Sequence, residues 1–257
     1  MPYVTNQGVH IYYEVVGDGP DLVLLHGGLS NLKIWYDTPY LKTLNKDYRL
    51  VLIDIRGHGA SDKPHDSKAY EMKLLVDDIT AVLDDLNVDK AHFFGYSLSG
   101  RLGFGTAKYA PKRFRSFIIG GAHPYLLDQN ELEADLSLFR RGMNAMIVAM
   151  EEASGSKMTT ERKASLVVND LDAIVALFSA SHWRTSIEDA LSNMTMPCLI
   201  FAGEADPLHA GAKKCAESMP YATFISLPDT GHFGVLSQSQ VLLPQITRFL
   251  ANQPREK

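Results

Sequence analysis

The stretch Phe93–Arg101, with the sequence FFGYSLSGR, decides the fold of this chain. Its apolar start predicts a short buried strand, and a helical pattern follows over residues 101–109. Between them lie Gly95, Ser97 and Ser99, which are small enough for a turn in which strand and helix backbones approach closely. The sequence therefore predicts a strand, a sharp turn and a helix, with the Ser97 hydroxyl at the apex.

This turn nearly matches the pattern G-x-S-x-G, in which a serine is held between a strand and a helix. Free backbone N–H groups and the positive end of the helix dipole would face its hydroxyl. The departure is Ser99, where the pattern has its second glycine. Serine is small, so we expect Ser99 to be structural, with its buried hydroxyl bonded to a backbone carbonyl. A five-residue pattern also occurs by chance in ordinary Gly/Ser turns, so the rest of the chain must decide.

The composition limits the class of protein. A chain of 257 residues, 46% apolar and 21% charged, suits one large α/β domain or a domain with an insertion. Its net charge of −5, without a basic block, argues against nucleic acid as a partner. No apolar run is long enough to cross a bilayer and Met1–Thr5 lacks the positive flank of a secretory signal, so we expect a cytoplasmic protein with no membrane partner. The spacing of Cys198 and Cys215 suggests reduced thiols and no metal site.

Short apolar runs alternate with helical patterns through most of the chain. The predicted strands are Tyr3–Thr5, Val9–Val16, Leu22–Leu25, Arg49–Ile53, Ala91–Phe94, Phe114–Ile119, Pro197–Phe201 and Thr223–Leu227. The predicted helices are Trp35–Leu44, Met72–Leu86, Arg101–Tyr109, Leu208–Ser218 and Ser237–Leu250. After an antiparallel hairpin at one edge, this alternation implies a parallel sheet with helices on both faces.

Residues 124–194 differ in character from the segments on either side. Their pattern predicts helices over Leu132–Ala149, Ala164–Val168 and Leu171–Ser181, and contains no clear strand. So long a strandless stretch fits an insertion better than a single crossover connection. We therefore expect a core formed by residues 1–123 and 195–257, covered by a helical cap of residues 124–194. The alternative is that these helices simply cover the main domain.

Three candidate catalytic residues follow predicted strands, at the sheet edge where parallel α/β folds place their function. Serine is a poor nucleophile until a base takes its proton, and histidine is suited to that role. A carboxylate must then fix the imidazole tautomer and stabilise its cation. The candidates are Ser97, His232 as base and Asp206 as acid, although Asp206 could be a helix N-cap and His232 a surface residue.

A nucleophilic serine also requires donors for the oxyanion that forms during acyl transfer. The loop His26-Gly27-Gly28-Leu29 follows the neighbouring strand and offers bare backbone. We expect the N–H of Gly28 or Leu29 to act together with the N–H of Leu98, directly after the serine. His26 is interpreted as a structural brace of this loop.

These stretches together resemble the α/β-hydrolase superfamily over nearly the whole chain. The resemblance rests on His26–Gly28, Asp54–Ser61 (DIRGHGAS), Gly95–Gly100, Gly203–Asp206 and Gly231-His232. It implies an eight-stranded, mostly parallel sheet and supports the triad above. It also implies that Asp54–Ser61 is a structural loop. Some members carry the acid after the strand that ends here at Gly120-Gly121, but the first carboxylate there is Asp128.

The leading functional hypothesis is a serine hydrolase of small carboxylic esters or lactones that needs no cofactor or metal, as a monomer or homodimer. The nucleophilic serine argues against superfamily members that use aspartate at this position. A second hypothesis is a triad-dependent lyase resembling the menaquinone-pathway enzyme, or a carbon–carbon bond hydrolase; an anionic substrate would then need cations such as Arg140 and Arg141 in the cap. A third is a slow-turnover ligand receptor on the same fold.

Overall fold

The computed structural model describes residues 2–155 and 157–253, except for the side chains of residues 153 and 154. Its centre is one eight-stranded sheet with the order β1-β2-β4-β3-β5-β6-β7-β8. The strands are β1 (Tyr3–Asn6), β2 (Val9–Val16), β3 (Asp21–Leu25), β4 (Arg49–Ile53), β5 (Ala91–Tyr96), β6 (Phe114–Gly120), β7 (Cys198–Gly203) and β8 (Ala222–Leu227). Only the β1–β2 and β2–β4 pairs are antiparallel, which confirms the predicted edge hairpin and parallel sheet.

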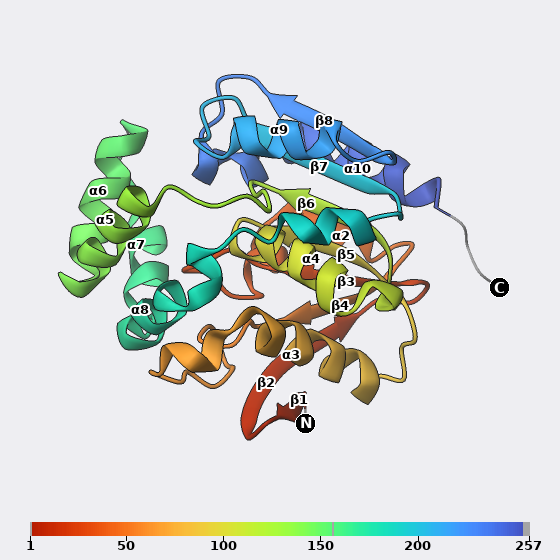
Figure 1. Ribbon diagram of the computed structural model, residues 1–257, viewed down its shortest axis with the longest axis horizontal. Helices are drawn as coiled ribbons and strands as arrows, with labels where there is room; N and C mark the ends of the chain where they lie inside the picture. The colour runs from red at the N-terminus through yellow and green to blue at the C-terminus, as the bar shows by residue number, and fades with distance from the viewer. Residues whose placement is uncertain (1, 156, 254–257) are drawn as a thin grey trace.

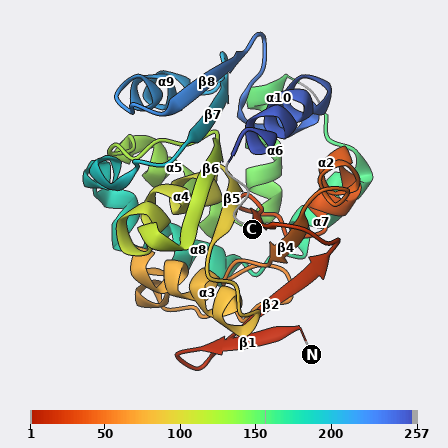
Figure 2. The same ribbon diagram turned by 90° about the vertical axis from the view of Figure 1, so that its right-hand side faces the viewer.

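Helices cover both faces of the sheet, as Figure 2 shows. One face carries α3 (Met72–Asp85), α4 (Leu98–Tyr109) and α9 (His209–Glu217); the other carries α1 (Ile34–Asp37), α2 (Pro39–Leu44) and α10 (Ser239–Ala251). Side chains alternate along β3, so that Val23 and Leu25 pack in the first apolar cluster while Leu22 and Leu24 pack in the second. A strand buried on both faces reads as a continuous apolar run, which explains why β3 was evident from the sequence.

The chain between β6 and β7 forms a group of helices at one end of the molecule (Figure 1, left). They are α5 (Gln129–Arg140), α6 (Met143–Ser154), α7 (Thr160–Val167), α8 (Leu171–Ser179) and the short η3 (Ser181–Arg184) and η4 (Glu188–Asn193). Within the described part of 124–194 there is no strand. These helices share an apolar cluster that includes Phe139, Met143, Met146 and Ile174, and Leu29 from the loop after β3 joins it.

Two predicted helices are each divided in the structure. The predicted helix Leu132–Ala149 is interrupted by Gly142, whose φ of 105° separates α5 from α6. The predicted helix Trp35–Leu44 is interrupted by Thr38, which is extended because a residue before proline avoids the helical region. Periodicity alone did not reveal these breaks, since apolar spacing continues across them. Near the C-terminus, a 3₁₀ turn, η5 (His232–Ser237), precedes α10.

Strand β5 and helix α4 approach each other closely at the turn that joins them. A Cβ on Gly95 would lie 2.4 Å from the Ser99 carbonyl oxygen, so only glycine fits there. Ser99 is fully buried, and its hydroxyl donates a hydrogen bond to the His26 carbonyl at the end of the adjacent β3. The expectation that this hydroxyl finds a backbone carbonyl is confirmed.

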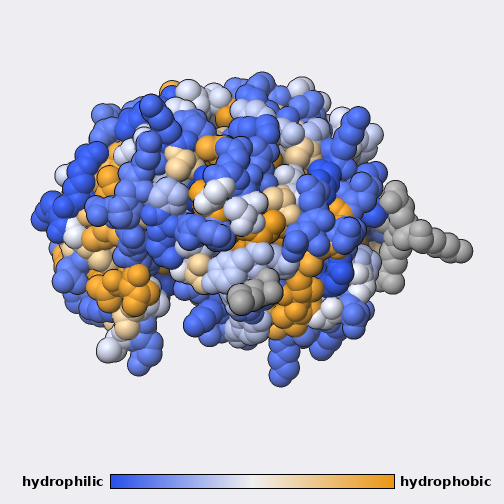
Figure 3. Space-filling model, turned by 90° about the horizontal axis from the view of Figure 1, so that it is seen from below, coloured by the Kyte–Doolittle hydropathy of each residue, from blue (hydrophilic) through white to orange (hydrophobic). Residues whose placement is uncertain are grey.

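The face of the protein seen from below in Figure 3 is predominantly polar. In the view of Figure 3, hydrophilic residues cover most of the face, and apolar residues form separate small groups. None of the helices in the described chain combines the length and apolar character that a bilayer-spanning helix requires.

The Ser99 hydrogen bond makes a specific stability prediction. Ser99→Ala removes the donor and leaves the buried His26 carbonyl unpaired, which should destabilise the fold by about 1–3 kcal/mol in urea unfolding. Ser99→Gly should keep most of the activity, because glycine suits the crowded turn. Ser99→Val should fail by steric clash. A Ser99→Val variant with wild-type stability would show that the turn is not crowded.

Candidate active site

Ser97 lies at the apex of the turn between β5 and α4. Its backbone adopts φ 57° and ψ −116°, a conformation that L-residues rarely adopt. The Ser97 N–H donates to the Gly120 carbonyl at 2.8 Å, which ties the apex to the end of β6. The strained backbone is therefore held by its neighbours, as is common where a side chain must be presented to a cleft.

The three candidate triad residues meet in one line of hydrogen bonds. Ser97 Oγ lies 2.8 Å from His232 Nε2, and His232 Nδ1 lies 2.7 Å from Asp206 Oδ2. The Asp206 side chain is fully buried, whereas 18% of the His232 side chain is exposed. Asp206 Oδ1 also accepts the Leu208 N–H at 2.9 Å. Asp206 therefore both orients the imidazole and secures the turn before α9.

Two hydrogen bonds to backbone carbonyls position Asp206 and His232. The Ala205 N–H donates to the Thr230 carbonyl at 3.1 Å, which joins the loop after β7 to the loop after β8. The Tyr96 hydroxyl donates to the His232 carbonyl, and the two rings are 5.5 Å apart. Tyr96 directly precedes Ser97, so it fixes the histidine loop relative to the serine. The sequence did not single out Tyr96.

Backbone donors lie beside the serine. Within the described residues, the N–H groups of Gly28 and Leu98 have no hydrogen-bond partner. The Leu29 N–H, in contrast, donates to His58 Nε2 at 3.3 Å. Leu29 has a φ of 57°, another uncommon conformation that this contact helps to hold. Of the two candidates in this loop, Gly28 is the one whose donor is unoccupied.

Two buried histidines, His26 and His58, hold the loop after β3 through hydrogen bonds. His26 Nε2 accepts the Ile55 N–H at 3.1 Å, and its Nδ1 lies 2.7 Å from the Gly27 carbonyl. Burial lowers the pKa of His26 to about 4 and that of His58 to about 3. Both rings are therefore neutral near pH 7, which leaves the His58 Nε2 lone pair available to accept the Leu29 N–H. The interpretation of His26 as a structural brace agrees with these contacts.

The loop after β4 is held by its own carboxylate. Asp54 accepts the N–H groups of Leu32 and Ala60, each at 2.7 Å. Arg56 is buried and makes a two-point ion pair with Asp78 of α3, with N–O distances of 2.9 and 2.6 Å. Asp54 and Arg56 are both engaged in contacts within the fold. These contacts agree with the structural role that the resemblance implied for this loop.

Arg101 is a buried cation whose contacts the sequence did not predict. Its guanidinium donates to the carbonyl oxygens of His123 and Tyr125 at 3.0 and 3.1 Å. It also donates to those of His182 and Thr185 at 3.1 and 2.8 Å. The first pair lies where the chain leaves β6 and the second lies just after α8, so one side chain next to the serine turn joins the start of the inserted segment to the stretch that follows α8.

Aromatic side chains border the loop His26–Leu29. Phe178 Cζ lies 3.4 Å from the position that a Cβ on Gly28 would take. The Phe178 ring stacks on Phe139 at 5.4 Å and on Trp183 at 5.2 Å. Arg101 lies 5.6 Å from the centre of the Trp183 ring. The aromatic side chains next to Gly28 are therefore apolar neighbours of this loop. One of them, Trp183, packs against Arg101.

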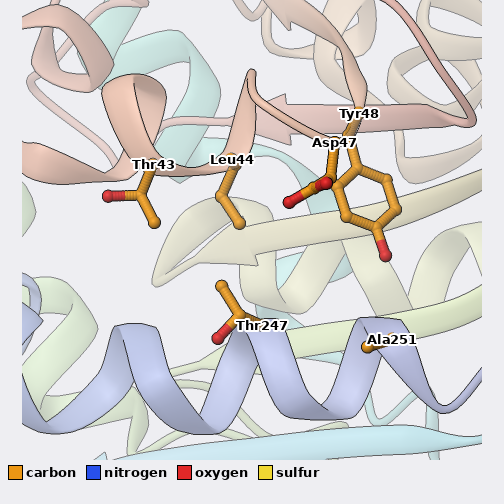
Figure 4. Close-up of a pocket in the computed structure, with 6 residues that line it drawn as sticks. All are labelled: Thr43, Leu44, Asp47, Tyr48, Thr247 and Ala251. Atoms are coloured by element: carbon orange, nitrogen blue, oxygen red, sulfur yellow. The ribbon is translucent and has the colours of Figure 1, made fainter.

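Other polar groups and hollows lie away from the triad. Within the described chain, His65, Asp170 and Asp172 have potential metal-ligand atoms within 4.8 Å of one another, but His65 pairs with Asp170 and Asp170 caps α8. A small pocket lies between the segment Thr43–Tyr48 and α10 (Figure 4). That segment precedes β4, so the pocket lies at the amino ends of the parallel strands, opposite the edge that carries Ser97.

The fold and this arrangement define an α/β-hydrolase. The family model for the alpha/beta hydrolase fold matches residues 20–194, and the chain belongs to that family. It is an α/β-hydrolase enzyme.

Individual relatives cover nearly the whole chain. A protein of Synechocystis sp. (strain ATCC 27184 / PCC 6803 / Kazusa) assigned as a non-heme chloroperoxidase is 26% identical over 97% of this chain and 100% of its own. One of Bacillus subtilis (strain 168), assigned as a 2-succinyl-6-hydroxy-2,4-cyclohexadiene-1-carboxylate synthase, is 23% identical over 94% of this chain and 96% of its own. The structure of Est816, described as an N-acyl homoserine lactone degrading enzyme, is 28% identical with a TM-score of 0.81 and covers 96% of this chain and 100% of that chain.

The buried histidines predict a stability that depends on pH. Burial lowers the pKa of five histidines, from 6.5 to about 4 for His26, His92 and His123 and to about 3 for His58 and His182. The unfolded chain takes up these protons first as the pH falls. Their contribution to stability is thus complete above about pH 6.5 and is lost as the pH falls toward the folded values, with a slope of up to about 1.4 kcal/mol per pH unit for each histidine.

Urea unfolding between about pH 7.5 and pH 5.5 measures this slope. His92→Gln is a suitable comparison because His92 forms a hydrogen bond with Ser116 Oγ and lies outside the site. This variant should show a shallower slope than the wild type. A stability that is flat over this range would contradict the neutral state of these rings.

Proposed function

We propose that this protein is a serine hydrolase of carboxylic esters or lactones, with Ser97, His232 and Asp206 as its triad. The observation that carries the proposal is the continuous line of hydrogen bonds at 2.8 and 2.7 Å from Ser97 Oγ through His232 to Asp206. The unoccupied donors of Gly28 and Leu98 next to it support the same reaction.

In this mechanism Ser97 Oγ attacks the acyl carbon while His232 Nε2 takes its proton. The N–H groups of Leu98 and Gly28 stabilise the oxyanion, because the Leu29 N–H is occupied by His58. His232 then gives the proton to the leaving alcohol oxygen as the bond from carbon to oxygen breaks and an acyl-enzyme forms. Water, deprotonated by His232, attacks this ester and releases the acid, which restores Ser97.

The hydrogen bonds of the buried Arg101 favour hydrolysis over the lyase alternative. The Bacillus subtilis relative keeps the lyase as a second candidate. Arg101 is the cation closest to the serine in sequence, but it is buried and its Nη atoms donate to four backbone carbonyls, so these atoms are not free to bind an anionic substrate. The resemblance to Est816, described as degrading a lactone, supports the hydrolytic proposal. We further propose that residues 124–194 act as the cap that sets the substrate range.

Ser97→Ala should abolish ester hydrolysis and leave the fold intact. We expect kcat to fall by about 10³-fold or more, because triad residues act as a unit. Turnover of a 4-nitrophenyl ester measures this, and multiple turnovers by the wild type would exclude a mere ligand receptor. A fluorophosphonate label followed by mass spectrometry should mark Ser97. A labelled Ser99 with an unlabelled Ser97 would overturn the assignment of the nucleophile.

Asp206→Asn should reduce activity severely, although less than His232→Ala. The amide can still form a hydrogen bond, but it can hold the imidazole in the wrong tautomer. Asp128→Asn is the matched control: Asp128 caps α5 by accepting the Asn130 N–H at 2.7 Å, and asparagine is an equally good cap. Near-wild-type activity of Asp206→Asn, together with an inactive Asp128→Asn, would show that the acid is misassigned.

A further inference from the structure

Leu29 ends the loop of residues 26–29 in a strained backbone conformation. Its φ of 57° lies in the left-handed region, which apolar residues rarely occupy because Cβ crowds the following carbonyl. Ser97, the proposed nucleophile, shares this φ. The other described non-glycine residues with a positive φ are exposed polar residues in turns, namely Gln7, Asn87 and Asp229. The strain at Leu29 has no such local explanation, and its position directly after Gly28 relates it to the candidate site.

The Leu29 side chain is buried among the inserted helices. Only 7% of the residue is exposed, and it belongs to an apolar cluster with side chains of α5, α6, α7 and α8. In the part of the chain that the structure describes, all other members of this cluster lie within residues 124–194. Burial of a leucine side chain is favourable enough to offset a left-handed backbone. The inserted helices therefore stabilise the strained end of the loop.

Phe178 of α8 contacts the same loop one residue earlier. Its Cζ and Cε2 atoms lie 3.4 and 3.9 Å from the position that a Cβ on Gly28 would take. The ring is held by stacking on Phe139 at 5.4 Å and on Trp183 at 5.2 Å. The inserted helices thus contact two successive residues of the loop, and one of them is Gly28, whose N–H is the proposed oxyanion donor.

The rest of the fold restrains this loop firmly at its start. There the Ser99 hydroxyl donates to the His26 carbonyl. At the other end, the Leu29 N–H reaches His58 Nε2 at 3.3 Å, which is long for a hydrogen bond from a backbone N–H. The two glycines in between have no side chain that could fix the backbone. Burial of the Leu29 side chain is therefore the stronger restraint at the end of the loop.

We propose that Leu29 is a positioning residue: burial of its side chain among the inserted helices holds the loop in the conformation that directs the Gly28 N–H toward the oxyanion. The inference rests on the proposed hydrolase function and deepens it, because it makes these helices part of the catalytic arrangement. Leu29 itself touches no reacting atom. When the helices undock, nothing supports the strained φ, so the loop relaxes and the donor is lost. Occupation of the oxyanion site and docking of the helices are thus coupled in both directions.

Substitutions of Leu29 separate the side chain from the backbone. Leu29→Gly removes the buried side chain but accepts a positive φ without strain, whereas Leu29→Met keeps an apolar side chain of similar volume. With a 4-nitrophenyl ester, Leu29→Gly should lower kcat by about tenfold or more with little change in KM, since loss of a whole oxyanion donor costs about 10²-fold or more. Leu29→Met should keep most of the activity. Affinity for a trifluoromethyl ketone, whose adduct with Ser97 carries the same oxyanion, should fall in parallel with kcat.

Leu166→Ala is the matched control for Leu29→Ala. Both substitutions remove the same atoms from a buried leucine of the same apolar cluster, but Leu166 lies in α7 and outside the loop. Both variants should lose stability in urea unfolding, because each leaves a cavity in the cluster. Only Leu29→Ala should lower kcat.

A measurement on the wild type requires no variant to fold. The carbonyl of 1,1,1-trifluoroacetone accepts Ser97 Oγ as His232 takes the proton, and the resulting oxyanion uses the Gly28 donor. Its single methyl group leaves little that could contact the inserted helices. Its binding should nevertheless slow amide hydrogen exchange in α6 and α7, because filling the oxyanion site favours the docked helices. Addition of the same ketone to Ser97→Ala should leave this exchange unchanged.

The inference is wrong if Leu29→Gly keeps the wild-type kcat, if Leu166→Ala lowers kcat as much as Leu29→Ala, or if trifluoroacetone leaves hydrogen exchange in α6 and α7 of the wild type unchanged. The proposed function survives these results as long as Ser97→Ala abolishes ester turnover. If the wild type turns over no ester, the proposed function fails and this inference fails with it.

Discussion

The close approach of β5 and α4 at Gly95 is the constraint on which the rest of the structure depends. It forces the chain to reverse within a few residues, and Ser97 takes up the strain with a positive φ. The Ser97 N–H bond to Gly120 and the Ser99 hydroxyl bond to His26 then attach this turn to the strands on both sides. One local contact thereby fixes the serine relative to β3 and β6, whose ends carry the other parts of the site.

Burial of polar groups provides the rigidity around this turn. His26 and His58 contact the loop after β3 as neutral rings, and the Asp54 carboxylate accepts two backbone N–H groups next to them. A buried polar group stabilises a structure only when it is paired, so these contacts specify one arrangement of the loop. Arg101 extends the same principle to the inserted helices, because its four carbonyl partners join the start of that segment and the stretch after α8 to the helix that begins after Ser97.

The charges near the proposed site have different functions according to their surroundings. Asp206 is buried and fully engaged, so it can orient His232. Arg101 is a buried cation whose Nη atoms donate to four backbone carbonyl oxygens, so its charge stabilises the backbone around it.

The sequence by itself determined the order of strands and helices, the parallel sheet and the small residues of the serine turn, because apolar periodicity and backbone crowding are local properties. It also brought Ser97, Asp206 and His232 forward as candidates, whose catalytic roles stay a prediction. The helix breaks at Thr38 and Gly142 were missed since apolar spacing continues across them. The three-dimensional structure was needed to show that the Leu29 N–H donates to His58 and that Arg101 joins the start of the inserted segment to the stretch after α8. Each of these contacts joins segments distant in the chain, and their meeting depends on loop paths and helix rotations that no local pattern encodes.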